Sequence, residues 1–402
     1  MTTRGRTLAA LAASMLVFGR LGGMRELIMA GASFALVLVL GFLLVWLRGG
    51  RVRAQRKVVP VQAFVGGRVR VELTVEAGGR LGFGPLLLAD RVPRAVGPSP
   101  RLALPGAGHA RRRAVAYTIT PRLRGRYTIG PLELTHTDPF GAVRRHVNAP
   151  GASPLLVLPA FEEINALPTG VQRIGIVRNS PLVGQGDEFY ALRAYEEGDD
   201  LRKIHWPTSA KIGQLVVRQE ELLAEPRALI VLDTTAAKHK GRGAASSLEA
   251  AVSACASVGV LAIRRRMRID VLTPDGPLLR HRTPSERQLL HALAVVEASK
   301  RRGLTNALER TAGRPGRAAL VVVITPGLTK DELRAMASRA KGAAAGAVVL
   351  VDASTFERKA QRISRSAEAD LAMLSLPVMH LRAGDSFRTV WNAGVYGVAL
   401  AR

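Results

Sequence analysis

The first 57 residues contain two apolar segments. Leu27–Leu47 runs for 21 residues without a charge, and as a helix rising about 1.5 Å per residue it would span ~30 Å, the thickness of a bilayer hydrocarbon core. A shorter apolar run, Leu8–Gly19, precedes it, and extending this run over Thr7–Met24, with Arg20 reaching towards the interface, gives a second span. The pattern predicts a transmembrane helical hairpin over residues 1–57. The alternative for the first run is a signal peptide, but Arg20 stands where a small-residue cleavage site should be.

Basic residues border both ends of this predicted hairpin. Arg4 and Arg6 precede the first span, and five basic residues follow the second: Arg48, Arg51, Arg53, Arg56 and Lys57. Because cytoplasmic flanks carry the excess of lysine and arginine, both ends should be cytoplasmic. We therefore expect a two-helix membrane protein whose remaining domains lie in the cytoplasm.

Residues 58–159 show short alternating segments separated by glycine and proline. Examples are Arg68–Val75, Arg113–Ile119 and Gly125–Leu134. Alternation with a period of two predicts strands with one buried face, and this spacing is typical of a small antiparallel β-sandwich. Its expected role is spacing or protein contact.

Residues 226–402 alternate short apolar strands with alanine-rich helical stretches. The predicted strands are Ala228–Leu232, Met267–Leu272, Ala318–Ile324, Ala347–Val351 and Val378–Leu381, and the predicted helices are Ser247–Arg264, Ser285–Glu297, Lys330–Gly342 and Ser354–Arg365. Such a pattern indicates a doubly wound α/β domain with a mostly parallel sheet. Ligands of these domains bind at the carboxyl ends of the strands, so the residues after Leu232 and Ile324 are of most interest.

The composition narrows the function classes. The formal charge of the 402-residue chain is +27, but its basic residues are spread throughout and only 4% of residues are aromatic. This scatter favours attraction to an anionic membrane surface over nucleic-acid binding. The one cysteine, Cys255, lies in an alanine-rich run and is expected to fill the core, so no disulfide framework exists.

Residues 160–225 form a connector with an unusual run, Gly184–Lys211, that is dense in charges, aromatics and glycine. Its large apolar residues predict a packed, salt-bridged segment rather than a solvated linker. The string from Glu188 to Trp206, followed by Val217–Glu221, resembles the signature of the domain-of-unknown-function 58 (DUF58) family, and His205 departs slightly from it. The resemblance assigns partner binding to Glu188, Phe189, Leu192, Arg193, Tyr195, Gly198, Asp199, Asp200, Arg202, Trp206 and Arg218.

That resemblance implies a von Willebrand factor A-like, Rossmann-like fold for residues 226–402. The metal-ion-dependent adhesion site of such domains would here use Asp233, Thr235 and Thr305, with hard oxygen ligands that suit Mg²⁺. Ala237 replaces one hydroxyl, and Thr325-Pro326-Gly327 lacks the last aspartate. Two of the five ligand positions are thus lost, and Asp233 making turn hydrogen bonds is the alternative. No cofactor is expected, with Mg²⁺ left open.

The sequence contains no nucleotide-binding loop of the Gly-x-x-x-x-Gly-Lys-Ser/Thr type and no Gly-x-Ser-x-Gly elbow. Asp199 and Asp200 are read as ion-pair partners of Arg193 or Arg202, not as catalytic carboxylates. We therefore expect a non-catalytic, membrane-anchored adaptor, and the resemblance implies a MoxR-type AAA+ ATPase as its protein partner. The alternative is a divalent-metal-dependent enzyme or binding protein acting on an anionic lipid or cell-envelope precursor at the membrane face.

Overall fold

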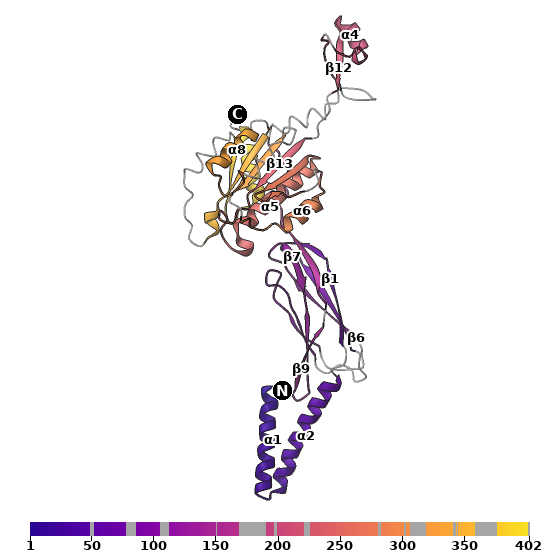
Figure 1. Cartoon of the computed structure of the whole chain (residues 1–402), viewed down its shortest axis with the longest axis vertical. Helices are drawn as coiled ribbons and strands as arrows, with labels where there is room; N and C mark the ends of the chain where they lie inside the picture. The colour runs from indigo at the N-terminus through magenta and orange to yellow at the C-terminus, as the bar shows by residue number, and fades with distance from the viewer. Residues whose placement is uncertain are drawn as a thin grey trace. The chain divides into compact units, whose positions relative to one another are not determined.

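Figure 1 shows the computed structural model of the chain, which divides into two compact units. The first comprises Met1–Phe161, Gly241–Ala256 and Arg287–Glu297, and the second comprises Glu162–Lys240, Ser257–Glu286 and Ala298–Arg402. The structure describes residues 1–48, 52–77, 86–104, 112–149, 151–168, 190–196, 199–220, 226–279, 283–300, 303–305, 319–340, 343, 345–357 and 376–400.

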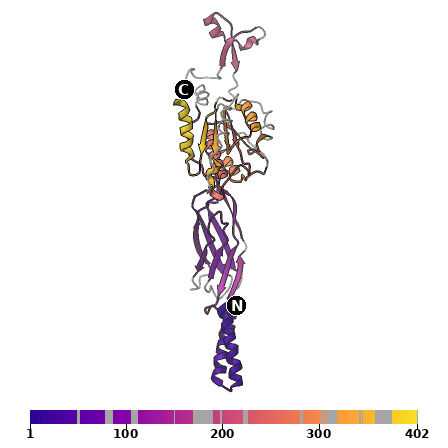
Figure 2. The same ribbon diagram turned by 90° about the vertical axis from the view of Figure 1, so that its left-hand side faces the viewer.

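The chain begins with two helices, α1 (Thr3–Leu21) and α2 (Arg25–Arg48), which lie side by side in Figures 1 and 2. The Thr2 side chain caps α1 by accepting a hydrogen bond from the Gly5 amide at 3.1 Å. Glycines allow the close approach of the two helices, because a Cβ on Gly19 would lie 2.9 Å from Ile28 and one on Gly31 would lie 2.9 Å from Leu16. The predicted helical hairpin is therefore present.

Two described helices are long and apolar enough to cross a membrane. One is Arg25–Trp46 within α2, and the other is Ser247–Arg264, which is mostly buried inside the protein as a core helix. Helix α1 is not one of them. Length and composition therefore support the second predicted span, Leu27–Leu47, more directly than the first.

Ten strands follow the hairpin: β1 (Val52–Val59), β2 (Gln62–Phe64), β3 (Val69–Ala77), β4 (Leu86–Asp90), β5 (Arg101–Leu104), β6 (Arg112–Ile119), β7 (Gly125–Ile129), β8 (Leu132–Thr137), β9 (Arg144–Ala149) and β10 (Ser153–Leu158). They form three sheets of order β1-β3-β6, β2-β10-β7 and β5-β4-β8-β9. One shared core holds alternate residues of these strands, such as Val69, Val71 and Leu73 of β3. The alternation in the sequence thus predicted the inward faces correctly. Pairing is antiparallel as predicted, except that β2 and β10 run parallel.

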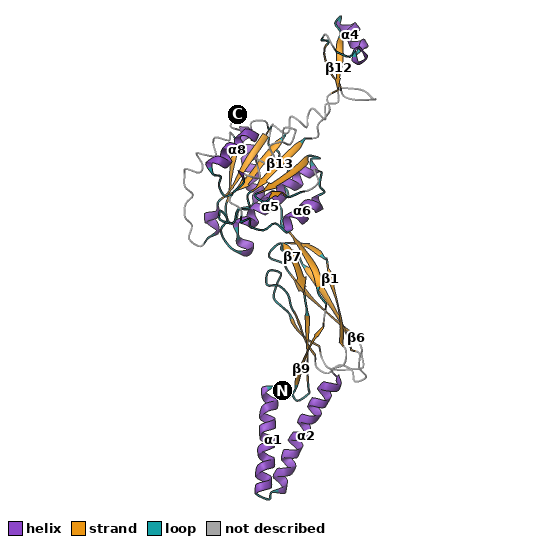
Figure 3. Ribbon diagram, viewed as in Figure 1, coloured by secondary structure: helices purple, strands orange, loops and turns teal. Residues whose placement is uncertain are grey.

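The second unit contains a six-stranded sheet (Figure 3). Its members are β13 (Arg227–Leu232), β14 (Arg268–Thr273), β15 (Gly276–Pro277), β16 (Leu320–Thr325), β17 (Ala345–Val351) and β18 (Val378–Leu381), in the order β15-β14-β13-β16-β17-β18. All neighbours are parallel except the short edge strand β15. Numbered from β13 within this sheet, the strands have the order 3-2-1-4-5-6 of doubly wound sheets, in which the winding direction changes between β13 and β16.

The helices that follow β13 along the chain are α5 (Ser247–Arg264), α6 (Glu286–Ala294), α8 (Lys330–Ala340) and α10 (Phe387–Leu400), with short 3₁₀ turns at η2 (Gly243–Ala245) and η3 (Ala353–Phe356). Three predicted helices are confirmed, with ends that differ by at most three residues from those of α5, α6 and α8. The fourth prediction, Ser354–Arg365, meets only η3, and residues 358–365 lie outside the described part. Alternate strand residues such as Leu229 and Val231 pack with Leu333 and Met336 of α8.

The described part of the connector has two pieces. In the first, Glu162 accepts hydrogen bonds from the Phe387 and Arg388 amides at the start of α10, and the Ala166 carbonyl accepts one from the indole of Trp391. The second piece, residues 190–220, consists of β11 (Tyr190–Ala194), η1 (Leu201–Lys203), α4 (Trp206–Ile212) and β12 (Val216–Glu220). We call this second piece the signature module.

Candidate functional site

A cluster of buried polar side chains lies where the winding direction of the six-stranded sheet changes. Leu232 pairs with Ile324 across β13 and β16, and the Asp233 amide continues the ladder by donating to the Ile324 carbonyl at 2.9 Å. Asp233 and Thr325 therefore stand side by side at the carboxyl ends of neighbouring parallel strands. This is the position at which doubly wound domains bind ligands.

Both carboxylate oxygens of Asp233 are fully engaged. Oδ1 accepts hydrogen bonds from the Thr235 amide at 3.0 Å and the Thr235 hydroxyl at 2.6 Å. Oδ2 accepts from the Thr325 hydroxyl at 3.0 Å and from Nζ of Lys238 at 2.8 Å. The Asp233 side chain is 0% exposed, so its charge is compensated inside the protein rather than by water.

Lys238 supplies the compensating positive charge. Its Nζ also contacts the carbonyl oxygen of Gly327 at 3.0 Å and the Glu332 carboxylate, with Oε2 at 2.8 Å and Oε1 at 3.2 Å. Burial alone would lower the pKa of Lys238, but the charges and hydrogen bonds of Asp233 and Glu332 outweigh it and raise that pKa. The ammonium ion is therefore the stable form at this site.

Glu332 ties the cluster to helix α8 and to a further loop. Its Oε2 accepts from the Thr329 amide at 2.8 Å while its own amide donates to the Thr329 hydroxyl, which is the reciprocal arrangement of a capping box. Its Oε1 accepts from the Leu304 amide at 2.7 Å, which places the loop containing the half-buried Thr305 beside the cluster. Glu332 is 1% exposed.

The predicted metal ligands can be tested against this geometry. Asp233 and Thr235 are brought together as expected, but the Thr235 hydroxyl donates its proton to Asp233, and Lys238 lies where a cation between the two carboxylates would sit. Within the described residues, no group of three or more His, Cys, Asp and Glu side chains could hold a metal ion. The residues present do not fit Mg²⁺, which needs open oxygen ligands at about 2.0–2.1 Å. The alternative, Asp233 in turn hydrogen bonds, matches the contacts.

Sequence reasoning missed Lys238 and Glu332. The spacing Thr329-x-x-Glu332 ahead of an amphipathic segment was a readable capping signal. It would have placed Glu332 in the first turn of α8, but its approach to a lysine 94 residues away depends on the fold.

The signature module is a strand pair closed by short helices. Leu192 of β11 stands opposite Arg218 of β12, and the Tyr195 amide donates to the Leu215 carbonyl at 2.9 Å. The Glu196 amide donates to the Asp199 carboxylate at 3.0 Å, which closes the turn after β11.

The first residues of the module's two short helices are held by side-chain caps. Asp200 caps η1 by accepting from the Arg202 amide at 3.0 Å. Asp199 and Asp200 thus each accept a hydrogen bond from a backbone amide of the module, and their predicted ion pair with Arg193 or Arg202 stays a prediction. His205 caps α4, since its Nδ1 accepts from the Thr208 amide at 3.3 Å.

The apolar residues of the module divide into two sets. Ile204, Val216 and Val217 are buried between the helices and β12, whereas Leu201 and Trp206 are 60% and 64% exposed. The expectation that Trp206 packs inside the connector is therefore wrong, because seven residues of α4 and two short strands enclose too little volume to cover an indole. Glu188, Phe189 and Gly198 lie outside the described residues, and of Leu192, Arg193 and Arg218 only the backbone is described.

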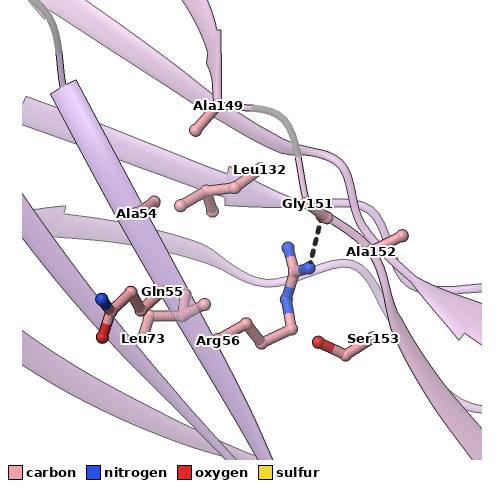
Figure 4. A pocket seen from close by; sticks show the side chains of 9 residues that line it. All are labelled: Ala54, Gln55, Arg56, Leu73, Leu132, Ala149, Gly151, Ala152 and Ser153. Atoms are coloured by element: carbon pink, nitrogen blue, oxygen red, sulfur yellow. Dashed lines mark hydrogen bonds between the residues drawn. The ribbon is translucent and has the colours of Figure 1, made fainter.

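A cavity of about 190 Å³ opens between the sheets of the first unit, beside Arg56 (Figure 4). The Arg56 guanidinium does not offer its charge to this space. It forms a bidentate pair with Asp90 at 2.6 and 3.1 Å and donates to the Ile129 and Gly151 carbonyls. The one charged residue that lines the cavity, Arg56, is therefore already paired within the protein and is not a free anion-binding group.

These features define a class of protein with an N-terminal helical hairpin, a β-sandwich, and a doubly wound α/β domain that carries a separate strand-and-helix module. Residues 191–358 match the family described as "Protein of unknown function DUF58". The match runs from β11 of the signature module to just beyond η3 of the α/β domain. It supports assignment of the chain to the DUF58 family.

Several solved structures resemble parts of the chain. They include the CARDB domain of the PF1109 protein from Pyrococcus furiosus (16% identity, 27% of this chain and 88% of that one, TM-score 0.20), the alkylpurine DNA glycosylase AlkC from Pseudomonas fluorescens (14%, 33% and 39%, 0.18) and Cwp6 from Clostridium difficile (8%, 86% and 39%, 0.20). At these TM-scores none of them informs the function. No curated protein matched the chain.

Proposed function

We propose that this chain is a non-catalytic, membrane-anchored adaptor that docks a protein partner through its signature module. The partner implied by the family resemblance is a MoxR-type AAA+ ATPase. The α/β domain is assigned as von Willebrand factor A-like, an assignment supported by its strand order of 3-2-1-4-5-6 with an antiparallel edge strand.

The observation that carries the docking proposal is the exposure of large apolar side chains on the signature module. Leu201, Trp206, Ile212 and Leu215 are 60%, 64%, 61% and 43% exposed. They lie within 15 residues of the sequence, and the buried apolar residues of the described module are Ile204, Val216 and Val217. Exposed aromatic and aliphatic side chains concentrated in this way are typical of protein contacts, where tryptophan contributes strongly to binding.

Membrane anchoring is supported by helix α2. Its outward residues Leu36, Val39, Phe42 and Trp46 are 58–64% exposed, and such a face is stable in hydrocarbon but costly in water. The cytoplasmic placement rests on the basic flanks. Arg56 contributes less to the positive charge of the second flank than the sequence indicated, because its charge is paired with the fully buried Asp90.

The alternative function, a divalent-metal-dependent enzyme acting on an anionic lipid or cell-envelope precursor, gains no support from the contacts. It would need Asp233, Thr235 and Thr305 to hold a cation. The carboxylate of Asp233 is instead saturated by hydrogen bonds from Thr235, Thr325 and Lys238.

The proposal is tested by affinity capture with the detergent-solubilised full-length chain in the presence and absence of ATP, followed by mass spectrometry. We compare the wild type with Trp206→Ala, and use Tyr396→Ala as a control because Tyr396 is a similarly exposed aromatic (57%) on α10. Both variants should fold, since exposed side chains contribute little to stability. We expect enrichment of an AAA+ ATPase by the wild type and Tyr396→Ala, and its loss with Trp206→Ala. Equal capture by Trp206→Ala would place the contact elsewhere, and no ATPase in any sample would refute the adaptor proposal.

A further inference from the structure

The polar cluster at the carboxyl ends of β13 and β16 has the layout of a cation site. Two carboxylates, Asp233 and Glu332, are 0% and 1% exposed, come from sequence positions 99 residues apart, and point at one centre. Buried carboxylates that share a centre without a cation repel each other and take up a proton. Here the centre holds the Nζ atom of Lys238, within 2.8 Å of both carboxylates.

The ammonium group has no unused hydrogen. Lysine has three N–H donors, and three acceptors surround Nζ: the carboxylate of Asp233, the carboxylate of Glu332 and the Gly327 carbonyl. Asp233 is engaged on both oxygens as well: Oδ1 accepts two hydrogen bonds from Thr235, and Oδ2 accepts one from Lys238 and shares the single proton of the Thr325 hydroxyl with the Gly327 carbonyl. A catalytic or adhesive metal ion keeps an open position for an incoming ligand, and this site has none.

We propose that the ammonium of Lys238 is the built-in cation of this site, and that it makes the site independent of metal and closed to external carboxylate ligands. The lysine joins the loop after β13, the loop after β16 and the first turn of α8 by its own charge. Partner binding through a metal-bridged acidic residue at this edge of the sheet is thereby excluded. The proposal stands apart from the adaptor function, because its test needs no partner.

The proposal makes an unusual prediction about removal of the lysine. Lys238→Ala leaves two buried carboxylates and a vacated volume, which is the arrangement that a divalent cation fills. Lys238→Met removes the same charge but keeps the volume occupied by an apolar chain. A divalent cation should therefore rescue the first variant and not the second.

The experiment measures Mn²⁺ binding by electron paramagnetic resonance and thermal unfolding with and without Mn²⁺, using the detergent-solubilised full-length chain. Lys240→Ala serves as the matched control, because Lys240 lies in the same loop and its pair with Glu357 is about half exposed. We expect no Mn²⁺ binding and no shift in melting temperature for the wild type and Lys240→Ala up to millimolar Mn²⁺. We expect Lys238→Ala to melt lower in chelator and to bind Mn²⁺ at least about tenfold more tightly than the wild type, with recovery of the melting temperature.

Two results would overturn the proposal. One is saturable Mn²⁺ binding by the wild type that is lost with Asp233→Asn, since this would show that the lysine yields its place to a metal. The other is equal behaviour of Lys238→Ala and Lys238→Met with Mn²⁺. The wild-type measurement shows whether the native site binds Mn²⁺ even if Lys238→Ala does not fold in chelator.

Discussion

Removal of the Asp90 charge should destabilise the β-sandwich more than any surface substitution. The Asp90 carboxylate is 0% exposed and pairs with the 5% exposed Arg56, with Oδ1 to Nη2 at 2.6 Å. It also accepts a hydrogen bond from the Tyr117 hydroxyl at 2.6 Å. Burial together with this hydrogen bond to Asp90 raises the pKa of Tyr117, which favours the protonated phenol that donates to Asp90. Asp90→Asn keeps the shape but places an amide N–H₂ against a donor and leaves Arg56 without its counter-charge.

Loss of one partner from a buried ion pair costs about 3–5 kcal/mol. Every 1.4 kcal/mol is a tenfold change in an equilibrium constant, so amide protection in β3 and β6 should fall by roughly two to four orders of magnitude. Hydrogen exchange followed by mass spectrometry on the detergent-solubilised chain measures this change. Peptides from β16 and β17 in the second unit provide the internal control. A decrease smaller than about tenfold in β3 and β6 would show that Asp90 is not a principal stabiliser of the sandwich.

Three further predictions concern other contacts. Glu162→Gln should speed exchange at the Phe387 amide and cost about 0.5–2 kcal/mol, because Glu162 caps α10. Burial would raise the pKa of Glu162, but its hydrogen bonds to the start of α10 outweigh this and lower it. The stabilisation is therefore present above the unfolded-state pKa and lost as pH falls through the folded one, which exchange at decreasing pH should detect in α10. Arg124→Met should cost about 3 kcal/mol or more, since Arg124 is buried against Glu249 and two backbone carbonyls, and calorimetry should show a lower melting temperature. Trp206→Ala should change the free energy of unfolding by no more than the roughly 0.5 kcal/mol typical of surface sites, so calorimetry should show an unchanged melting temperature.

The α/β domain could be predicted from the sequence because its elements follow local rules. Ser247–Arg264 was predicted and observed with the same ends, and the predicted Ala228–Leu232 differs from β13 by one residue. Continuous apolar runs bounded by glycine, proline or charged residues specify buried strands whatever their neighbours are. The parallel pairing of β2 with β10 could not be predicted, because a three-residue strand has no periodicity that identifies its partner.

The sequence predicted only those contacts of the candidate site that join residues close together in the chain. Asp233 and Thr235 lie two residues apart after an apolar strand, so their proximity follows from the strand end. The convergence of Lys238 and Glu332 depends on the parallel register of β13 with β16 and on where α8 starts. A spacing of five residues between an aspartate and a lysine is compatible with many conformations of the loop. Only the folded sheet fixes the one in which the lysine reaches both carboxylates.

The metal site and the partner-binding site that the sequence predicted differ in how far their side chains are already satisfied within the protein. At the sheet edge, every hydrogen-bonding group of Asp233 and Lys238 is satisfied within the protein, so an external ligand would have to break existing bonds before it gained any. On the signature module, Trp206 and Leu201 expose apolar surface whose removal from water needs no such exchange. Binding free energy is available at the second location and not at the first. For this reason we propose partner recognition on the signature module, and for the closed lysine site a structural role, that of holding three segments of the α/β domain together without a metal.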